Sequence, residues 1–426
     1  MKELRPAVEV EEVVCSYEPP DNGSGPLWCY GSPLLVRTDA GVFVCVPETG
    51  RDAMPLCNTR WCLYRRDASG WERIHAGSRY DEREPCPLVQ LPGRGLYLSV
   101  NPAHDPGVER GPCHPRLLES PESALEDDPN PIEPRWLGDP AFTEHSYRGI
   151  GVDGDRGEIL LLNIEGSTSV QHWAFRDAGG EWSRQGGIEF QIRGCYPQVA
   201  MREQAGHILA IGDIVEPVEA WREHKYEQTG RDWDYVFRRL FYTWTPDITR
   251  EAFCSPLEID NVEATAGHIT NLDLHVDASG AAHILYLRRT VAQELIRERF
   301  FPHHTCVVSL EYVALASGKI VEQRQLLWAD GAPPGLTPSY GRFHTTPDGG
   351  LLVVYAATEA GDGTVGNYVM RLDGDAPPAR LELESPFRTF FTATERGGSP
   401  PSHLLDLYGV CGPGNTVRYA RVSLAE

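Results

Sequence analysis

The sequence predicts an all-β fold, and a β-propeller of seven blades fits it best. Turn signals recur from end to end, and most are followed by a short apolar or β-branched run. The 42 Gly and 34 Pro residues suit many short strands joined by tight turns. Repeated hairpins over 426 residues fit four-stranded blades of roughly 60 residues each better than a sandwich. Six blades, or seven with a long insertion, remain open.

The expected hairpins can be followed in chain order. The turns are residues 38–41, 67–70, 92–95, 153–157, 177–180, 277–280, 316–318, 348–350 and 362–363. Strand-like runs after them include residues 42–46, 159–162, 283–286 and 351–355. Helical periodicity is scarce, and the best helix candidate, residues 291–299, is too short to organise the fold.

Domain organisation follows from this rhythm. No linker separates two domains, so residues 1–426 are expected to form a single propeller. Two segments break the pattern and are expected to be surface excursions, near residues 101–140 and 215–235. The N- and C-terminal segments are expected to share one blade, because edge strands would otherwise be left unpaired.

Charge and cysteine usage narrow the class of protein. The formal charge of −22 argues against binding to nucleic acid or to an anionic membrane surface. The first twenty residues hold no apolar signal-peptide core, and no run is long enough to span a bilayer, so the sequence as given predicts a soluble cytoplasmic protein. Removal of a signal peptide would instead imply a secreted or periplasmic protein. Eleven scattered cysteines favour reduced, mostly buried thiols over a disulfide framework.

Three side chains of types that can give or take a proton fall at similar places in successive β units. His145 precedes the hairpin of residues 149–163, His172 lies in Gln-His-Trp-Ala-Phe, and Tyr196 begins a Tyr-Pro pair before another strand. Equivalent strand ends of a propeller meet on one face, so the three are expected to line one cavity near its axis. The alternative for each is an aromatic ring packed between blades.

These motifs resemble the sialidase-like BNR-repeat propellers that include ulvan lyases and related glucuronate lyases. Turns of the form Asp-x-Gly-x-x-apolar begin at Asp39, Asp155, Asp177 and Asp348 and resemble the Asp boxes of that group. The His, hairpin, His and Tyr-Pro order covers about 70 residues of the likeness. The resemblance implies that Tyr196 acts as base, and also as acid, while His145 and His172 assist or hold the substrate carboxylate.

One departure from the family pattern concerns the cation. The family places an arginine on the strand after the Tyr-Pro, where this chain has Ala-Ile-Gly-Asp at residues 210–213. Proton removal beside a carboxylate builds negative charge that a cation or strong donor must stabilise. The candidates for this role and for substrate binding are Arg193, Arg202, Arg238 and Arg239. Arg238 and Arg239 lie on a strand-like run and are expected to point to opposite faces of it, one of them into the cleft. The alternative is that the inward arginine forms a structural ion pair with Asp213 or Glu216.

No cofactor is required by this chemistry. Metal-ligand residue types occur in Cys113-His114 and His303-His304-x-Cys306 and leave a structural Zn²⁺ open, but no pair has the spacing of a zinc signature. Carboxylates at Asp213, Glu216 and Asp273 leave a structural Ca²⁺ open. The expected function is a lyase acting by β-elimination on an oligo- or polysaccharide that contains uronic acid. The alternatives are a sialidase-like glycoside hydrolase and a non-catalytic propeller that binds glycan or protein.

Overall fold

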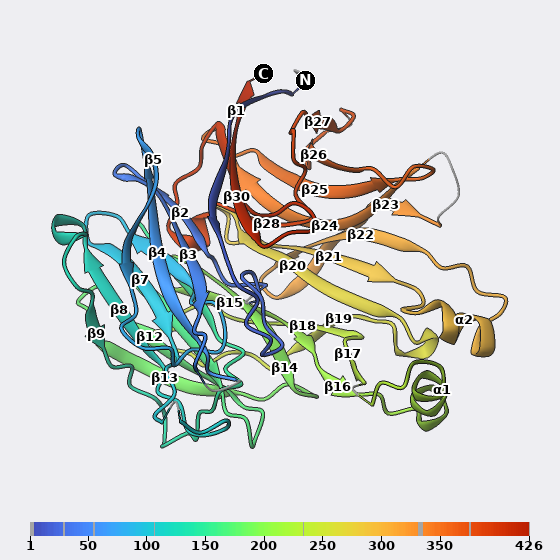
Figure 1. The fold of residues 1–426 in the computed structure, drawn as a ribbon, viewed down its shortest axis with the longest axis horizontal. Helices are drawn as coiled ribbons and strands as arrows, with labels where there is room; N and C mark the ends of the chain where they lie inside the picture. The colour runs from blue at the N-terminus through green and yellow to red at the C-terminus, as the bar shows by residue number, and fades with distance from the viewer. Residues whose placement is uncertain are drawn as a thin grey trace.

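The protein is a seven-bladed β-propeller whose blades follow one another in chain order around a central channel (Figure 1). The computed structural model describes residues 4–28, 30–53, 56–105, 107–232, 234–330, 335–374 and 376–425. Within these ranges it contains seven four-stranded antiparallel sheets, one two-stranded sheet and two short α-helices. The all-β seven-bladed fold expected from the sequence is confirmed.

The first four blades run from the N-terminal region to the middle of the chain. Blade 1 is β2 (Leu35–Thr38), β3 (Gly41–Thr49), β4 (Thr59–Asp67) and β5 (Gly70–Ala76). Blade 2 is β6 (Leu88–Leu91), β7 (Gly95–Val100), β8 (Arg116–Pro121) and β9 (Asn130–Ile132), with the 3₁₀-helix η1 (Glu122–Ala124). Blade 3 is β10 (Gly149–Asp153), β11 (Glu158–Ile164), β12 (Gln171–Arg176) and β13 (Trp182–Ile188). Blade 4 is β14 (Gly194–Arg202), β15 (Ala205–Gly212), β18 (Arg239–Thr245) and β19 (Leu257–Asn261).

The remaining blades complete the circle. Blade 5 is β20 (His268–Val276), β21 (Ala282–Arg289), β22 (Val308–Ala316) and β23 (Lys319–Ala329). Blade 6 is β24 (Leu336–Thr345), β25 (Leu351–Glu359), β26 (Val365–Arg371) and β27 (Ala379–Leu381). Blade 7 is β28 (Thr389–Thr392), β29 (Leu404–Val410), β30 (Thr416–Ala425) and the N-terminal β1 (Arg5–Ser16).

The circle closes through pairing of the two terminal strands. β1 lies antiparallel to β30, from Arg5 opposite Ala425 to Ser16 opposite Thr416. The two chain ends therefore lie together in Figure 1, and the expected sharing of one blade is confirmed. This pairing covers an edge of β30 that would otherwise be exposed.

The short turns form because aspartate side chains accept hydrogen bonds from the backbone that follows them. Asp277 Oδ1 accepts the N–H groups of Ser279 and Ala281, and Gly280 takes a φ of 78°. Asp177 does the same for Gly179 and Glu181. The predicted turns thus have the local bonding that aspartate and glycine favour.

The two segments expected as excursions contain regular structure. Residues 101–140 include β8, η1 and β9 of blade 2. Residues 215–235 carry the α1 helix (Glu219–Thr229) between the paired strands β16 (Ile214–Val215) and β17 (Tyr235–Val236). The α2 helix (Glu294–Phe300) lies beside α1, and Trp221 of α1 packs on Phe301 at 5.5 Å between ring centres. No helix in the described part of the chain is both long and apolar enough to cross a bilayer.

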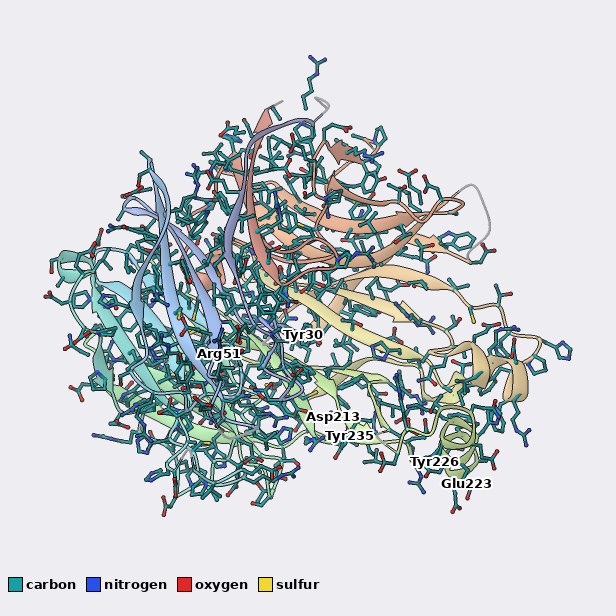
Figure 2. All side chains as sticks on the ribbon, in the orientation of Figure 1. Tyr30, Arg51, Asp213, Glu223, Tyr226 and Tyr235 are labelled. Carbon is teal, nitrogen blue, oxygen red and sulfur yellow. The ribbon has the colours of Figure 1, made fainter. Side chains whose placement is uncertain are left out.

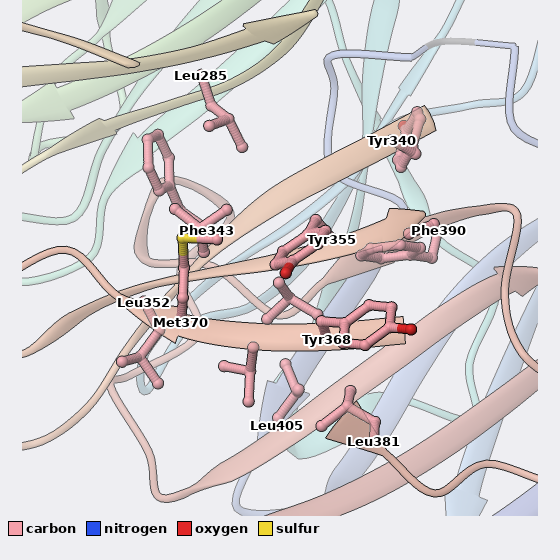
Figure 3. Packing of buried hydrophobic residues seen from close by; sticks show 14 of the residues in the cluster. Leu285, Tyr340, Phe343, Leu352, Tyr355, Tyr368, Met370, Leu381, Phe390 and Leu405 are labelled. Atoms are coloured by element: carbon pink, nitrogen blue, oxygen red, sulfur yellow. The ribbon is translucent and has the colours of Figure 1, made fainter. Parts of the chain in front are cut away.

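Apolar side chains fill the space between neighbouring blades. The cluster in Figure 3 joins blades 5, 6 and 7, with Leu285, Phe343, Tyr355 and Leu405 among its members. The described cysteines, ten in number, are free of disulfides, and six of them are buried.

The central channel is filled by charged side chains. Arg342 of β24 and Asp273 of β20 are both buried, with 3.8 Å between Arg342 Nη1 and Asp273 Oδ1. Arg396 of the 3₁₀-helix η3 (Glu395–Gly397), which joins β28 to β29, donates to the same oxygen at 2.9 Å. These three side chains therefore form a buried charged cluster at the centre of the propeller.

Candidate active site

Tyr196 lies in a bulge at the start of β14, the innermost strand of blade 4. Regular pairing with β15 is interrupted between Cys195 and Gln198, and Tyr196 takes a φ of 47°. The adjacent Pro197 has no N–H to give to the ladder, and a bulge turns a side chain out of the strand's ordinary alternation. The Tyr-Pro pair thus directs Tyr196 toward the face on which the innermost strands begin, which we call the proximal face.

Four aromatic rings surround Tyr196. Its ring centre lies 5.0 Å from that of Tyr147, 5.3 Å from Tyr30, 6.0 Å from Phe237 and 6.4 Å from Trp28. Burial, and then the neighbouring Cys195 and Tyr147, raise the pKa of Tyr196 well above its ordinary value. Its phenol is therefore protonated at neutral pH and is a proton donor in the resting protein.

Tyr147 is joined to a buried carboxylate and an arginine. Its hydroxyl donates to Asp213 Oδ2 at 3.1 Å, and Arg193 Nη2 donates to the same oxygen. The Arg193 guanidinium lies 5.7 Å from the centre of the Tyr147 ring and 5.0 Å from that of Tyr235. Burial raises the pKa of Asp213, and Arg193 opposes the rise. Figure 2 shows Asp213 and Tyr235 close together, with Tyr30 nearer the middle of the disc.

His145 is held neutral in this group. Its ring centre lies 5.8 Å from that of Tyr147. Burial, followed by the positive charges of Arg83, Arg193 and Arg110, lowers its pKa to about 4. Its Nδ1 has no hydrogen-bond partner among the described residues. A neutral imidazole with an unoccupied nitrogen can accept a proton at neutral pH.

Two guanidiniums near His145 keep unused donors. The Nε and Nη1 groups of Arg83 and the Nε group of Arg193 are buried without a hydrogen-bond partner in the described part of the chain. The backbone around Arg83 is fixed, because Asn22 Nδ2 donates to its carbonyl at 3.0 Å. Buried N–H groups without a partner carry a free-energy cost that an anionic ligand removes.

His172 lies at the start of β12 with a different set of neighbours. His145 lies in the loop before β10, and His172 and Tyr196 lie near the starts of β12 and β14. These strands run in the same direction within their blades, so all three residues lie on the proximal face. However, His172 packs on Phe142 at 5.8 Å and lies 3.4 Å from Glu165 Oε2. The structure links His145 to Tyr196 through Tyr147, and His172 has its contacts elsewhere.

The four predicted arginines occupy four different environments. Arg193 is the one in contact with Asp213 and Tyr147. Arg238 is buried in a two-pronged ion pair with Glu216, as the alternative interpretation predicts. Arg239 pairs with Glu258 and Gln191. Arg202 lies at the far end of β14 from Tyr196, 3.6 Å from Glu395 beside a cavity of about 310 Å³.

The residue types singled out for metal binding are dispersed. Cys113 is buried against Cys57, and His114 lies 2.5 Å from Glu133 Oε2. Among the described residues, no three His, Cys, Asp or Glu side chains gather as a metal ion requires. The Ca²⁺ or Zn²⁺ left open by the sequence stays without a defined site in this part of the chain.

Sequence reasoning missed Tyr147, Arg83, Trp28 and Tyr30. Tyr147 could have been found, because it stands two residues after His145. Arg193, which the sequence did indicate, stands in the same way three residues before Tyr196. Trp28 and Tyr30 come from the loop between β1 and β2, which joins blade 7 to blade 1, whereas Tyr196 belongs to blade 4. No local pattern indicates that this loop reaches Tyr196.

Comparison with known proteins supports the fold. No family model matches the sequence, and no curated protein matches it. Among solved structures, the chain is similar to the polysaccharide lyase Uly1, with 11% identity, 98% of this chain and 94% of that chain covered, and a TM-score of 0.54. It is less similar to an α-L-arabinanase of Penicillium chrysogenum, with 12% identity, 98% of both chains covered and a TM-score of 0.49. The similarity to the N-terminal domain of Nup159 covers 100% of this chain and 97% of that chain, with 7% identity and a TM-score of 0.48.

At 11% identity, the likeness to Uly1 shows a shared fold and leaves activity open.

Proposed function

We propose that the protein is a carbohydrate-active enzyme, and specifically a lyase that cleaves an oligo- or polysaccharide next to a uronic acid. The observation that carries the proposal is the neutral His145, with Nδ1 unoccupied, beside Arg83 and Arg193, whose buried N–H groups lack partners among the described residues. A base next to unused guanidinium donors suits proton removal beside a carboxylate. The fold shared with a polysaccharide lyase is consistent with this chemistry.

In the proposed reaction, His145 takes the proton from C5 of the uronate. The C4–O4 bond breaks, a C4=C5 double bond forms, and Tyr196 gives its phenolic proton to the departing O4. Arg193 and Arg83 bind the carboxylate and stabilise the charge that develops on it. We assign the base to His145 because the pKa of Tyr196 is raised and that of His145 is lowered.

A glycoside hydrolase is the second candidate, and one observation favours it. Asp213 is a buried carboxyl group whose pKa is raised by burial, and it bonds to the Tyr147 hydroxyl. A hydrolase usually needs a pair of carboxyl groups across the scissile bond. Glu84 lies in the same part of the molecule, but it is buried and accepts a hydrogen bond from Ser146 at 2.8 Å.

The test is a screen of uronate-containing poly- and oligosaccharides, read by the ultraviolet absorbance of an unsaturated uronate and by new reducing ends. A lyase gives both signals, and a hydrolase gives new reducing ends without the absorbance. His145→Ala is expected to abolish the absorbance signal, whereas His303→Ala, on an exposed loop, is expected to leave it unchanged. The acid limb of kcat/KM should lie near pH 4, where His145 becomes protonated. No signal with any uronate substrate would reject the lyase.

A further inference from the structure

A second cavity opens on the proximal face, away from the Tyr196 group. Its volume is about 760 Å³, within the range of small-molecule sites. It lies where β1 ends, β3 ends and β4 begins, and these strand ends share the face on which β14 begins. None of the residues that line it contacts Tyr196 or His145 through the interactions described above.

The lining combines an apolar floor with aromatic walls. Val46, Pro47 and Cys62 are buried and form part of the floor. Tyr17, Tyr64 and Tyr80 also line the cavity, and each keeps part of its side chain exposed. Tyrosine offers an apolar ring face together with a polar hydroxyl, which suits a ligand that has both C–H and O–H groups.

Glu48 is a fixed acceptor in the wall. It accepts hydrogen bonds from Tyr80 Oη at 2.7 Å, Arg73 Nη1 at 2.6 Å and Arg60 Nε at 2.9 Å. The Arg60 guanidinium also lies 4.9 Å from the centre of the Tyr80 ring. Glu48 therefore holds the Tyr80 hydroxyl in a fixed position in the wall before a ligand arrives.

The charges around this cavity balance. Arg60 and Arg73 lie on Glu48, and Arg51 lies 3.0 Å from Glu18 at the rim. The lining itself carries Glu18, Glu48, Asp52 and Arg51, and the guanidiniums of Arg60 and Arg73, which pair with Glu48 from outside the lining, bring the local charge to balance. The surroundings of His145 are different, because arginine donors there are in excess. The cavity therefore favours a ligand without net charge.

We propose that this cavity binds a neutral carbohydrate unit, as a second glycan site on the face that carries the candidate active site. Sugar hydroxyls would donate to Asp52 and to backbone carbonyls of the lining, and the C–H face of the sugar would pack on a tyrosine ring. The cavity and its charge balance stand independently, whereas the choice of carbohydrate as the neutral ligand rests on the proposed function.

The experiment measures binding to the full chain, without turnover. The probes are three oligosaccharides that carry no carboxylate, cellohexaose, xylohexaose and laminarihexaose, at millimolar concentrations in titration calorimetry and saturation-transfer NMR. Tyr17→Ala removes one aromatic wall, and Ser16→Trp fills the cavity from an exposed position at the end of β1. The matched control is Tyr226→Ala, because Tyr226 is 55% exposed on α1 (Figure 2).

We expect at least one probe to bind the wild type, with affinity about tenfold lower in Tyr17→Ala and Ser16→Trp and unchanged in Tyr226→Ala. Absence of binding by all three probes, or equal affinity in the two cavity variants, would overturn the proposal. Arg193→Met separates this site from the proposed function. Loss of probe binding in Arg193→Met would place the sugar at the candidate active site and reject the second site. Probe binding with a failed uronate screen would uphold the cavity and reject the lyase.

Discussion

Arginines occupy two contrasting environments in this protein. In the central channel, Arg342 donates to the carbonyls of Leu272 and Phe390 and to the hydroxyl of Tyr340, and its guanidinium lies 4.4 Å from the centre of the Phe391 ring. On the proximal face, Arg83 and Arg193 retain buried N–H groups that no described residue accepts. Saturated donors indicate a structural role, and unsaturated donors indicate a place for a ligand.

The two environments are connected through Tyr30. Arg342 Nη2 also donates to the Tyr30 carbonyl, and the Tyr30 ring packs edge-on against Tyr196. The channel core thus fixes one wall of the candidate site. The comparison predicts that channel variants lose stability and that proximal-face variants lose binding or activity.

The largest expected effect comes from Arg342→Met. Removing one member of a buried charge network costs about 3–5 kcal/mol, and several carbonyls would lose their donor as well. Urea unfolding should show this loss, with Arg231→Met, on an exposed loop, as the control. A loss below about 1 kcal/mol would mean that the channel arginine is no more structural than a surface one.

The second effect concerns pH and the buried histidines. Burial lowers the pKa of His344 to about 4 and that of His275 to about 3. The folded state then binds fewer protons than the unfolded state, so stability is full above pH 6.5 and is lost as the pH falls toward 4. Glu82 acts in the opposite direction, because burial raises its pKa to about 7.

His344→Gln should reduce the loss of stability between pH 7 and pH 4 by about 3 kcal/mol, since one pKa unit corresponds to about 1.4 kcal/mol. Urea midpoints of the wild type and the variant at both pH values provide the measurement. Parallel losses in the two proteins would show that His344 does not titrate in this window.

The third effect tests the close contact between Gly398, next to η3, and blade 2. Gly398 has a φ of 89°, and a Cβ there would meet the Gln90 carbonyl oxygen at 2.0 Å. Gly363 has a φ of 74° with open space around it. Gly363→Ala is expected to cost about 1 kcal/mol from the left-handed backbone, and Gly398→Ala about 2 kcal/mol more from the added clash. Equal melting temperatures for the two variants would contradict this close contact between Gly398 and Gln90.

The smallest effect on stability is expected for Arg193→Met. Asp213 has a raised pKa and can take up a proton when its partner is lost, so the cost should be about 1 kcal/mol. Turnover should fall about a hundredfold, as when one donor to a developing charge is removed. A stability loss as large as that of Arg342→Met would remove the distinction between the two environments.

The sequence predicted the repeating parts of the fold because each hairpin is local. Asp177 and Asp277 form their turns with residues at most four positions away. α1 was missed because it has no buried residue, and a helix without an apolar stripe gives no periodic signal. Its packing depends on Trp221 contacting Phe300 and Phe301 some eighty residues later.

The candidate site could be predicted only in part, for a similar reason. Tyr196 was visible as a Tyr-Pro pair, and the structure shows that this pair forms a bulge. Its neighbours come from the loop after β1, the loop before β10 and the segment before β18. Which loops meet depends on the number of blades and on closure of the circle, and a local sequence motif predicts neither. Residue type alone could not separate Arg193 from Arg238, because each has a carboxylate partner that lies twenty or more positions away.

The pairing of β1 with β30 sets a condition on how the protein can fold. The partners Arg5 and Ala425 lie 420 positions apart, the largest separation among the strand pairings of the described residues. During synthesis, β1 emerges before β30 and gains its partner only when β30 has been made. Blades 1 to 6 can be complete while β1 is still unpaired, and closure of the circle is then the late, slow event in folding. A chain that lacks its first sixteen residues would be expected to keep six blades and to expose the edge of β30 to other chains.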